Sequence, residues 1–166
     1  MTRPVVAILM GSDSDWPTFQ QAAEGLKEFG VPHEARVLSA HRSPSPLLRY
    51  LNEAAGRGIK VFIAGAGGAA HLAGVVAAHT TLPVIGVPIE TKFLNGLDSL
   101  LSTVQMPRGV PVATVAVGNG FNAAMLAVQI LAVHDRALQR RLASYKQRLE
   151  TKVLDADRAL HTRLKG

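Results

Sequence analysis

The sequence contains no cysteine among its 166 residues. Disulfide bonds, thiolate metal ligands and cysteine nucleophiles are therefore excluded, and we expect the protein to work in the reducing cytoplasm. Aromatic residues make up only 5% of the chain, so stacking on nucleic-acid bases has little support. No apolar run approaches the roughly 18 residues that a membrane-spanning helix needs. We expect neither a nucleic-acid partner nor a membrane segment.

The net charge of +6 is concentrated at one end of the chain. Residues 134–166 hold nine basic and four acidic side chains, whereas residues 1–133 hold nine and eight. The basic charge therefore belongs to a charged amphipathic segment, which we interpret as a solvated or subunit-facing helix.

Short apolar runs alternate with helical patterns along the first 133 residues. A chain of this length forms one domain with one core. The runs predict strands at 5–10, 33–38, 61–64, 82–88 and 112–117. They predict helices at 16–29, from Pro44 to Gly56 or Gly58 with Ser43 as the N-cap, from about 71 to 79, at 98–104 and at 122–133. This alternation predicts an α/β fold with a central parallel sheet and right-handed crossovers, flavodoxin-like or Rossmann-like. We expect a single domain over 1–166, with an α/β core to about 133 and a helical extension from 134 to 166.

Three loops follow predicted strands, at 11–15, 39–42 and 65–72. Ligands of parallel sheets bind beyond the carboxyl ends of the strands, so we expect these loops to form one site. The first loop carries Ser12, Ser14 and Asp15. Helix capping explains one of them, and the others suit a phosphate and ribose hydroxyls.

The second loop contains Ser39, Ala40, His41 and Arg42. A neutral imidazole both donates and accepts protons near pH 7, and a guanidinium binds carboxylate or phosphate with two donors. A histidine beside an arginine is common on protein surfaces, so its place after a strand is what indicates function.

The third loop is made almost entirely of small residues: Gly65, Ala66, Gly67, Gly68, Ala69, Ala70, His71 and Leu72. Small side chains leave the backbone amides open to an anion or a planar ring. The run also satisfies G-x-G-x-x-A, with Glu90 about where a ribose-binding acid is expected, so a nicotinamide dinucleotide is an alternative ligand. If the run binds no ligand, its small residues serve close packing of the chain. His71, at its end, either lines the site or has a structural role.

The sequence offers no pattern typical of a metal site. The histidines do not pair with one another at i, i+4 spacing, and two acids before a helix, Asp13 and Asp15, are more typical of capping than of magnesium binding. A phosphorylated receiver needs an aspartate after the third strand, where this chain has Ala64 and Gly65.

Six motifs in order carry a resemblance to a known family. They are Met10 to Trp16, Ser39 to Pro44, Ile63 to Leu72, Gly86 to Pro88, Gly96 to Leu100 and Gln105 to Pro107. Over about residues 5–150 the chain resembles the class I PurE family, 5-(carboxyamino)imidazole ribonucleotide mutases of purine biosynthesis. In that family the glycine turn holds a nucleotide substrate and no dinucleotide.

The resemblance implies a flavodoxin-like three-layer sandwich in a homo-octamer, with the C-terminal helix packing on neighbouring subunits. It implies an isomerase that moves a carboxylate from the exocyclic amine to a ring carbon without metal or organic cofactor, downstream of an ATP-dependent synthase. His41 would be the general acid and base. Ser12, Asp15 and Arg42 would bind the ribonucleotide, with its phosphate near Ser14. The substrate site would also include Ser39, Ala40, His71, the backbone of 65–68 and Leu72.

Two alternatives remain beside this function. One is a class II enzyme that carboxylates aminoimidazole ribonucleotide with free carbon dioxide, although Arg42 and the run from Gly67 to His71 favour class I. The other is a non-catalytic nucleotide-binding module. Because free carbon dioxide escapes into water, a mutase site is expected to be small, dry and lined by backbone and methyl groups. Departures from the family pattern, Phe93 and the short loop 118–121, affect the pocket mouth and subunit contacts.

Overall fold

The structure is a computed structural model that describes residues 3–165. The chain forms two compact units, Met1–Ile130 and Leu131–Gly166. The first unit holds the sheet and the candidate site, and the second holds the C-terminal helix.

The first unit is built around a five-stranded sheet in the order β2-β1-β3-β4-β5, with all neighbouring strands parallel. The strands are β1 (Val6–Met10), β2 (His33–Val37), β3 (Val61–Gly67), β4 (Val84–Ile89) and β5 (Ala113–Thr114). Every residue of β1 is buried, as expected for a parallel strand covered on both faces. The predicted parallel, flavodoxin-like α/β fold is confirmed.

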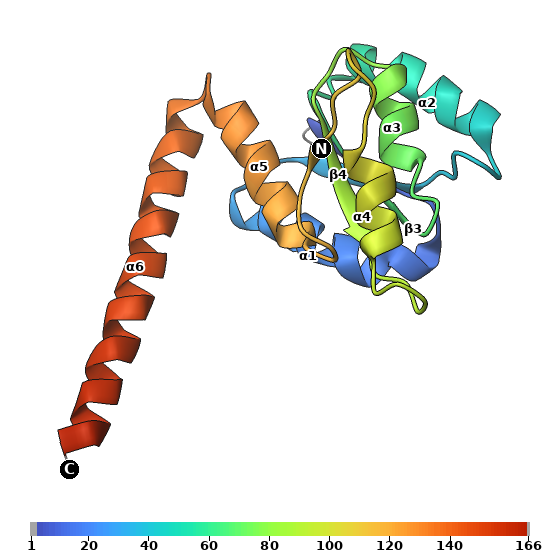
Figure 1. The fold of residues 1–166 in the computed structure, drawn as a ribbon. Helices are drawn as coiled ribbons and strands as arrows, with labels where there is room; N and C mark the ends of the chain where they lie inside the picture. The colour runs from blue at the N-terminus through green and yellow to red at the C-terminus, as the bar shows by residue number, and fades with distance from the viewer. Residues whose placement is uncertain (1–2, 166) are drawn as a thin grey trace. The chain divides into compact units, whose positions relative to one another are not determined.

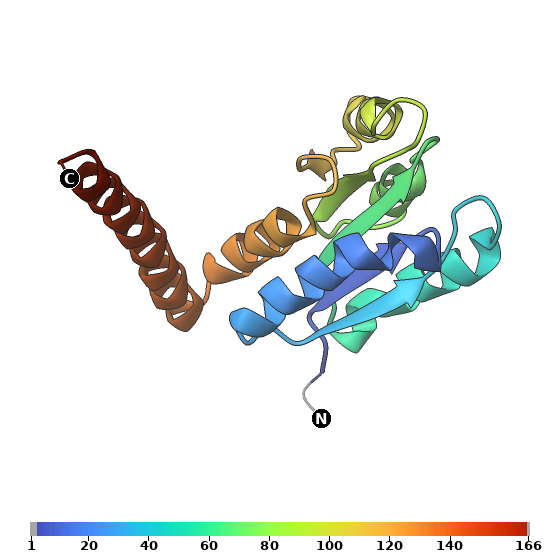
Figure 2. The same cartoon turned by 90° about the horizontal axis from the view of Figure 1, so that it is seen from below.

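Helices cover both faces of this sheet (Figure 1 and Figure 2). They are the short 3-10 helix Asp13–Asp15, α1 (Trp16–Glu28), α2 (Pro44–Arg57), α3 (Leu72–Ala78), α4 (Leu97–Val104) and α5 (Gly120–Ala132). Helices α1 and α5 pack so closely that a Cβ added at Gly25 would lie 2.9 Å from the Ala124 Cβ. On the opposite face, α2 and α3 share one buried cluster with β1 and β3.

That cluster positions the site because it fixes α2 and α3 on the central strands. Its large members include Leu47 and Leu51 from α2, Leu72 and Val76 from α3, and Phe62 from β3. Each such side chain contributes roughly 1.5–3 kcal/mol when fully buried. The loops that precede α2 and α3 are therefore anchored at their helical ends.

Two strand lengths differ from the sequence-based expectation. Strand β3 continues into the glycine run as far as Gly67, because the small residues keep pairing with β4, with Gly67 opposite Ile89. Strand β5 has only two residues instead of the six predicted, and pairs with β4 at Ile85 and Gly86 alone.

Ser43 occupies the N-cap position of α2, as predicted, but its hydroxyl does not cap the helix. It accepts a hydrogen bond from the Ser39 N–H (2.9 Å) and donates one to the Ser39 carbonyl (3.1 Å). The side chain therefore closes the loop before the helix instead of its first turn.

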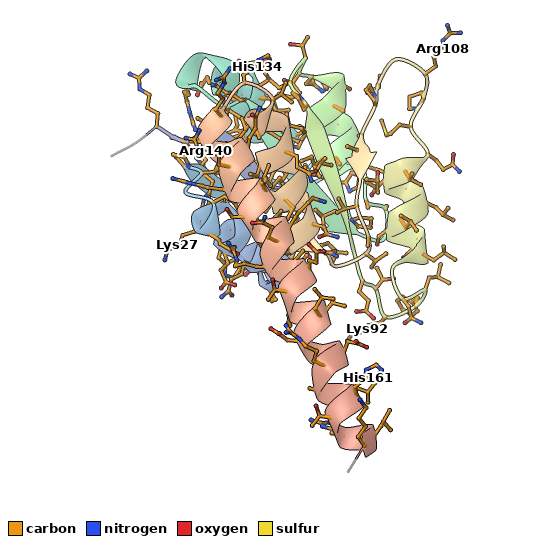
Figure 3. The ribbon with its side chains drawn as sticks, turned by 90° about the vertical axis from the view of Figure 1, so that its left-hand side faces the viewer. Lys27, Lys92, Arg108, His134, Arg140 and His161 are labelled. Carbon is orange, nitrogen blue, oxygen red and sulfur yellow. The ribbon has the colours of Figure 1, made fainter. Side chains whose placement is uncertain are left out.

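The second unit is dominated by α6 (Arg136–Lys165), whose only buried residue within the described range is Leu138. Figure 3 labels Arg140 near the beginning of this helix and His161 near its end. Of the helices that the structure describes, none is both long and apolar enough to span a bilayer.

Gly65 is packed too tightly to carry a side chain. A Cβ there would lie 2.1 Å from the Val87 carbonyl oxygen and 2.9 Å from the Phe19 ring, whereas a Cβ at Gly56 in α2 would meet nothing within 4 Å. We expect Gly65→Ala to destabilise the protein by about 3 kcal/mol through overpacking. The control Gly56→Ala should stabilise it by about 0.5–1 kcal/mol, since alanine is the better helix former. Urea unfolding of both variants measures this, and equal midpoints would contradict it.

Candidate active site

The three predicted loops converge on one cavity of about 270 Å³ at the carboxyl edge of the sheet. The loop after β1 contributes Gly11, Ser12, Ser14 and Asp15, the loop after β2 contributes Ser39, Ala40, His41 and Arg42, and the segment after β3 contributes Ala66, Gly67, Ala69 and Leu72. Ten of the thirteen predicted site residues thus line one space. Gly65, Gly68 and His71 are not among its lining residues.

The first loop concentrates hydroxyl groups around a carboxylate. The Ser14 hydroxyl lies 2.9 Å from the Ser12 Oγ and 3.4 Å from an Asp15 carboxylate oxygen. Burial raises the pKa of Asp15, an effect that hydrogen bonds from Ser12 and Ser14 and the charge of Arg42 partly offset. A carboxylate held among hydroxyls in this way is suited to accept hydrogen bonds from sugar hydroxyls.

Arg42 ties the first two loops together. Its Nη2 donates to the Gly11 carbonyl at 2.7 Å, and its backbone N–H donates to the Ser39 hydroxyl at 3.1 Å. A guanidinium has five N–H donors, so this arrangement leaves donors for an anion in the cavity. Sequence reasoning missed Gly11, because its contribution is a backbone carbonyl that leaves no signature in residue type.

His41 is hydrogen-bonded to a second histidine. Its Nε2 lies 2.8 Å from the Nδ1 of His71, and the two rings meet edge to face with centroids 4.9 Å apart. His71 thus contacts His41 but is not among the residues that line the cavity. One ring nitrogen of His41 is engaged, and the other is the one left for proton exchange.

The glycines of the third loop have different surroundings. Gly65 is buried against Val87 and Phe19, so its lack of a side chain serves close packing. Gly68 adopts a left-handed conformation with φ of 70°, and its backbone is hydrogen-bonded to Ser99 and Ser102 of α4. Sequence reasoning also missed these serines. For Ser99 the available signal was the motif Gly96 to Leu100, which carried part of the family resemblance but was given no role, whereas Ser102 lies outside every motif.

The site is not dry in this chain by itself. His41, Arg42 and His71 are all exposed, whereas Leu72 beneath them is buried. The water-poor surroundings expected for a mutase are therefore not supplied by the chain alone. Within residues 3–165, no group of three or more histidine, aspartate or glutamate side chains could hold a metal ion.

The chain is similar to proteins of known name over most of its length. A family model described as AIR carboxylase matches residues 5–152. The N5-carboxyaminoimidazole ribonucleotide mutase of Synechocystis is 58% identical over 152 residues, which is 92% of this chain and 86% of that protein. The Mycobacterium tuberculosis protein of the same name is 54% identical over 164 residues, which is 99% of this chain and 94% of that protein.

A solved structure has the same fold. The crystal structure of Treponema denticola PurE superposes with a TM-score of 0.86 at 32% identity, over 93% of this chain and 97% of that one.

The raised pKa of Asp15 predicts a cost in stability. The folded protein binds this proton more tightly than the unfolded chain, so stability falls as the pH rises from the ordinary pKa of 3.8 through the raised one. Asp15→Asn removes the cost, and we expect a slightly higher melting temperature than that of the unsubstituted protein near pH 7. The difference should shrink toward pH 4. Glu53→Gln, at an exposed carboxylate on α2 that is not among the causes of the Asp15 shift, is the control. A lower melting temperature for Asp15→Asn at pH 7 would refute the expectation.

Proposed function

Since this chain belongs to the AIR carboxylase family, we propose that it is an N5-carboxyaminoimidazole ribonucleotide mutase. It is then an isomerase of purine biosynthesis that acts on a small ribonucleotide. The observation that carries the proposal is the convergence of Asp15, from the segment after β1, with His41 and Arg42, from the loop after β2, on one cavity. Relatives with this name at 54–61% identity support the mutase over the class II carboxylase.

The ribonucleotide is held by the first two loops. Arg42 and Ser14 bind the phosphate, because a guanidinium and a hydroxyl supply charge-assisted donors at the cavity edge. Asp15 and Ser12 accept hydrogen bonds from the ribose. Ser39 and Ala40 lie beside these groups in the cavity lining and shape the space for the imidazole ring.

His41 transfers the protons of the reaction. Protonation of the exocyclic nitrogen lets its bond to the carboxylate break, which gives carbon dioxide and the free amine. The ring carbon then attacks carbon dioxide, a carbon–carbon bond forms, and the proton on that carbon must be removed. One imidazole that first gives a proton and then takes one back balances the sequence. His71 at 2.8 Å fixes which nitrogen of His41 is free to do so.

The third loop retains the carbon dioxide. Ala66, Gly67 and Ala69 line the cavity with backbone and methyl groups, and Leu72 adds an apolar side chain. Carbon dioxide carries no charge that Arg42 could hold, so its retention depends on this enclosure. No metal or organic cofactor takes part in the proposed reaction.

The proposed enzyme is a homo-octamer whose C-terminal helix packs on neighbouring subunits. Exposed apolar side chains support this, since large apolar patches mark interfaces. In the first unit they include Phe93, Leu94, Leu97, Leu101 and Val104, and on α6 they are Leu149, Val153, Leu154, Leu160 and Leu164. Subunits that cover the exposed side of the cavity would supply the dry surroundings. An ATP-dependent synthase in the same cytoplasm would supply the unstable carbamate.

The activity is tested with freshly prepared carbamate substrate. A mutase forms the ring-carboxylated product at the same rate with and without added bicarbonate, because the substrate itself supplies the carboxylate. Conversion that occurs only from aminoimidazole ribonucleotide and bicarbonate would identify the class II reaction instead. Tight binding of NADH without turnover would identify a nucleotide-binding module.

His41→Asn should lower turnover by at least about 10²–10⁴-fold, the contribution typical of general acid–base catalysis. Binding of the stable ring-carboxylated product, measured by calorimetry, should remain, because Asp15 and Arg42 are unchanged. His79→Asn is the matched control, since His79 is an exposed histidine bonded to its own helix at Val75. Turnover of His41→Asn equal to that of the control would remove His41 from the mechanism.

A further inference from the structure

We propose that Ser99 of α4 is a positioning residue that holds the Gly68 peptide, and through it the part of the cavity lining that retains carbon dioxide. The inference rests on the proposed mutase function and assigns a role to a motif that the three loops leave unexplained. We call the pair of contacts from Ser99 and Ser102 to Gly68 the serine clamp. The contact from Ser99 is the shorter of the two, at 2.9 Å against 3.2 Å.

Ser99 is a buried polar side chain with a partner outside its own helix. It is fully buried, and its Oγ accepts the Gly68 N–H at 2.9 Å. Thr103, the neighbouring buried hydroxyl on α4, donates instead to the Ser99 carbonyl within the helix. Burial of a hydroxyl is unfavourable unless it is hydrogen-bonded, so the contact with Gly68 is what stabilises a serine at this position.

Gly68 needs this contact because the sheet ends just before it. The pairing of β3 with β4 stops at Gly67, opposite Ile89, and Gly68 turns away with φ of 70°. Its N–H therefore has no partner strand, and Ser99 takes the place of one. The residues on either side of Gly68, Gly67 and Ala69, both line the cavity.

Ser102 makes the second and weaker contact of the serine clamp. Its hydroxyl lies 3.2 Å from the Gly68 carbonyl and 2.7 Å from the Asp98 carbonyl in its own helix. One proton serves two acceptors, and the shorter contact is the one within α4. The Gly68 carbonyl also accepts the Ala70 N–H at 2.8 Å, so the turn keeps a second bond without Ser102.

The helix that carries the clamp is itself fixed to the sheet. A Cβ at Gly86 of β4 would lie 2.5 Å from the Thr103 side chain, which shows how closely α4 is seated on the strand. The Thr91 hydroxyl donates to the Asp98 carboxylate at 2.8 Å, which ties the beginning of the loop after β4 to the first turn of α4. The clamp therefore connects the turn to a rigid element, and the turn does not depend on the ligand for its shape.

A loosened turn has a specific chemical consequence. After the nitrogen–carbon bond breaks, carbon dioxide either forms the new carbon–carbon bond or leaves the cavity. If it leaves, another molecule of carbon dioxide enters from solution and takes its place in the product. Loss of the clamp should therefore increase exchange of the carboxylate with solvent.

The test uses fresh unlabelled carbamate in a buffer of carbon-13-labelled bicarbonate with carbonic anhydrase, and measures the labelled fraction of the product by mass spectrometry. Ser99→Ala should raise the enzyme-dependent labelled fraction by about fivefold, the factor expected from one lost neutral hydrogen bond. Thr103→Val is the matched control: it removes a buried hydroxyl of the same helix that does not contact Gly68, and it should leave the fraction unchanged.

A purely structural role gives a different result. If Ser99→Ala lowers the rate by reducing the amount of folded enzyme, the labelled fraction stays that of the unsubstituted protein, and the proposal is overturned. Should Ser99→Ala fail to fold, the half-buried Ser102→Ala decides, with a smaller rise expected and no rise refuting the clamp. Failure of the proposed function is distinguishable in the unsubstituted protein. A class II carboxylase would give product labelled to the level of the buffer, and a non-catalytic module would give no product.

Discussion

The parallel register of β1 with both of its neighbours is the constraint on which the site depends. Met10, the last residue of β1, lies opposite Val37 on one side and Gly65 on the other. The loops after β1 and β2 therefore leave the sheet at the same level, and β3 continues past them by two residues. Because the chain crosses from β2 over β1 to β3, these loops open at the point where the strand order reverses, which is where parallel sheets bind ligands.

Small residues make that register compatible with tight packing. Gly65 lets β3 approach the Val87 carbonyl and the Phe19 ring, and Gly86 lets α4 sit directly on β4. The same small residues that serve close packing inside the sheet form a bare backbone surface once the strand leaves it. The first part of this glycine- and alanine-rich segment packs inside the sheet, and the part that follows lines the cavity. Close packing and ligand binding therefore both account for its composition.

The proposed chemistry divides between two kinds of surface. Charged and hydroxyl groups on the first two loops suit a phosphorylated sugar, and they are held by contacts such as that from Arg42 to Gly11. The backbone and methyl groups of the third loop suit uncharged carbon dioxide. A hydrogen bond from the Gly68 N–H to Ser99 of α4 holds this loop in place. The outer side of α4 and its preceding loop expose Phe93, Leu97 and Leu101. A neighbour that covered this side would bury the helix that carries the serine clamp, which links assembly to the site in the proposed octamer.

The sequence by itself determined the α/β class, the strand positions and the three loops, because periodicity and turn residues act over a few neighbouring positions. His41 and Arg42 were predictable from their place after a strand, and the family resemblance rested on the same local motifs. Only the tertiary structure decided that Gly11 offers its carbonyl to Arg42, that His71 pairs with His41, and that Ser99 holds Gly68. These contacts join residues about thirty positions apart, and a hydrogen bond between distant segments depends on the packing of the whole sheet, which no local pattern records.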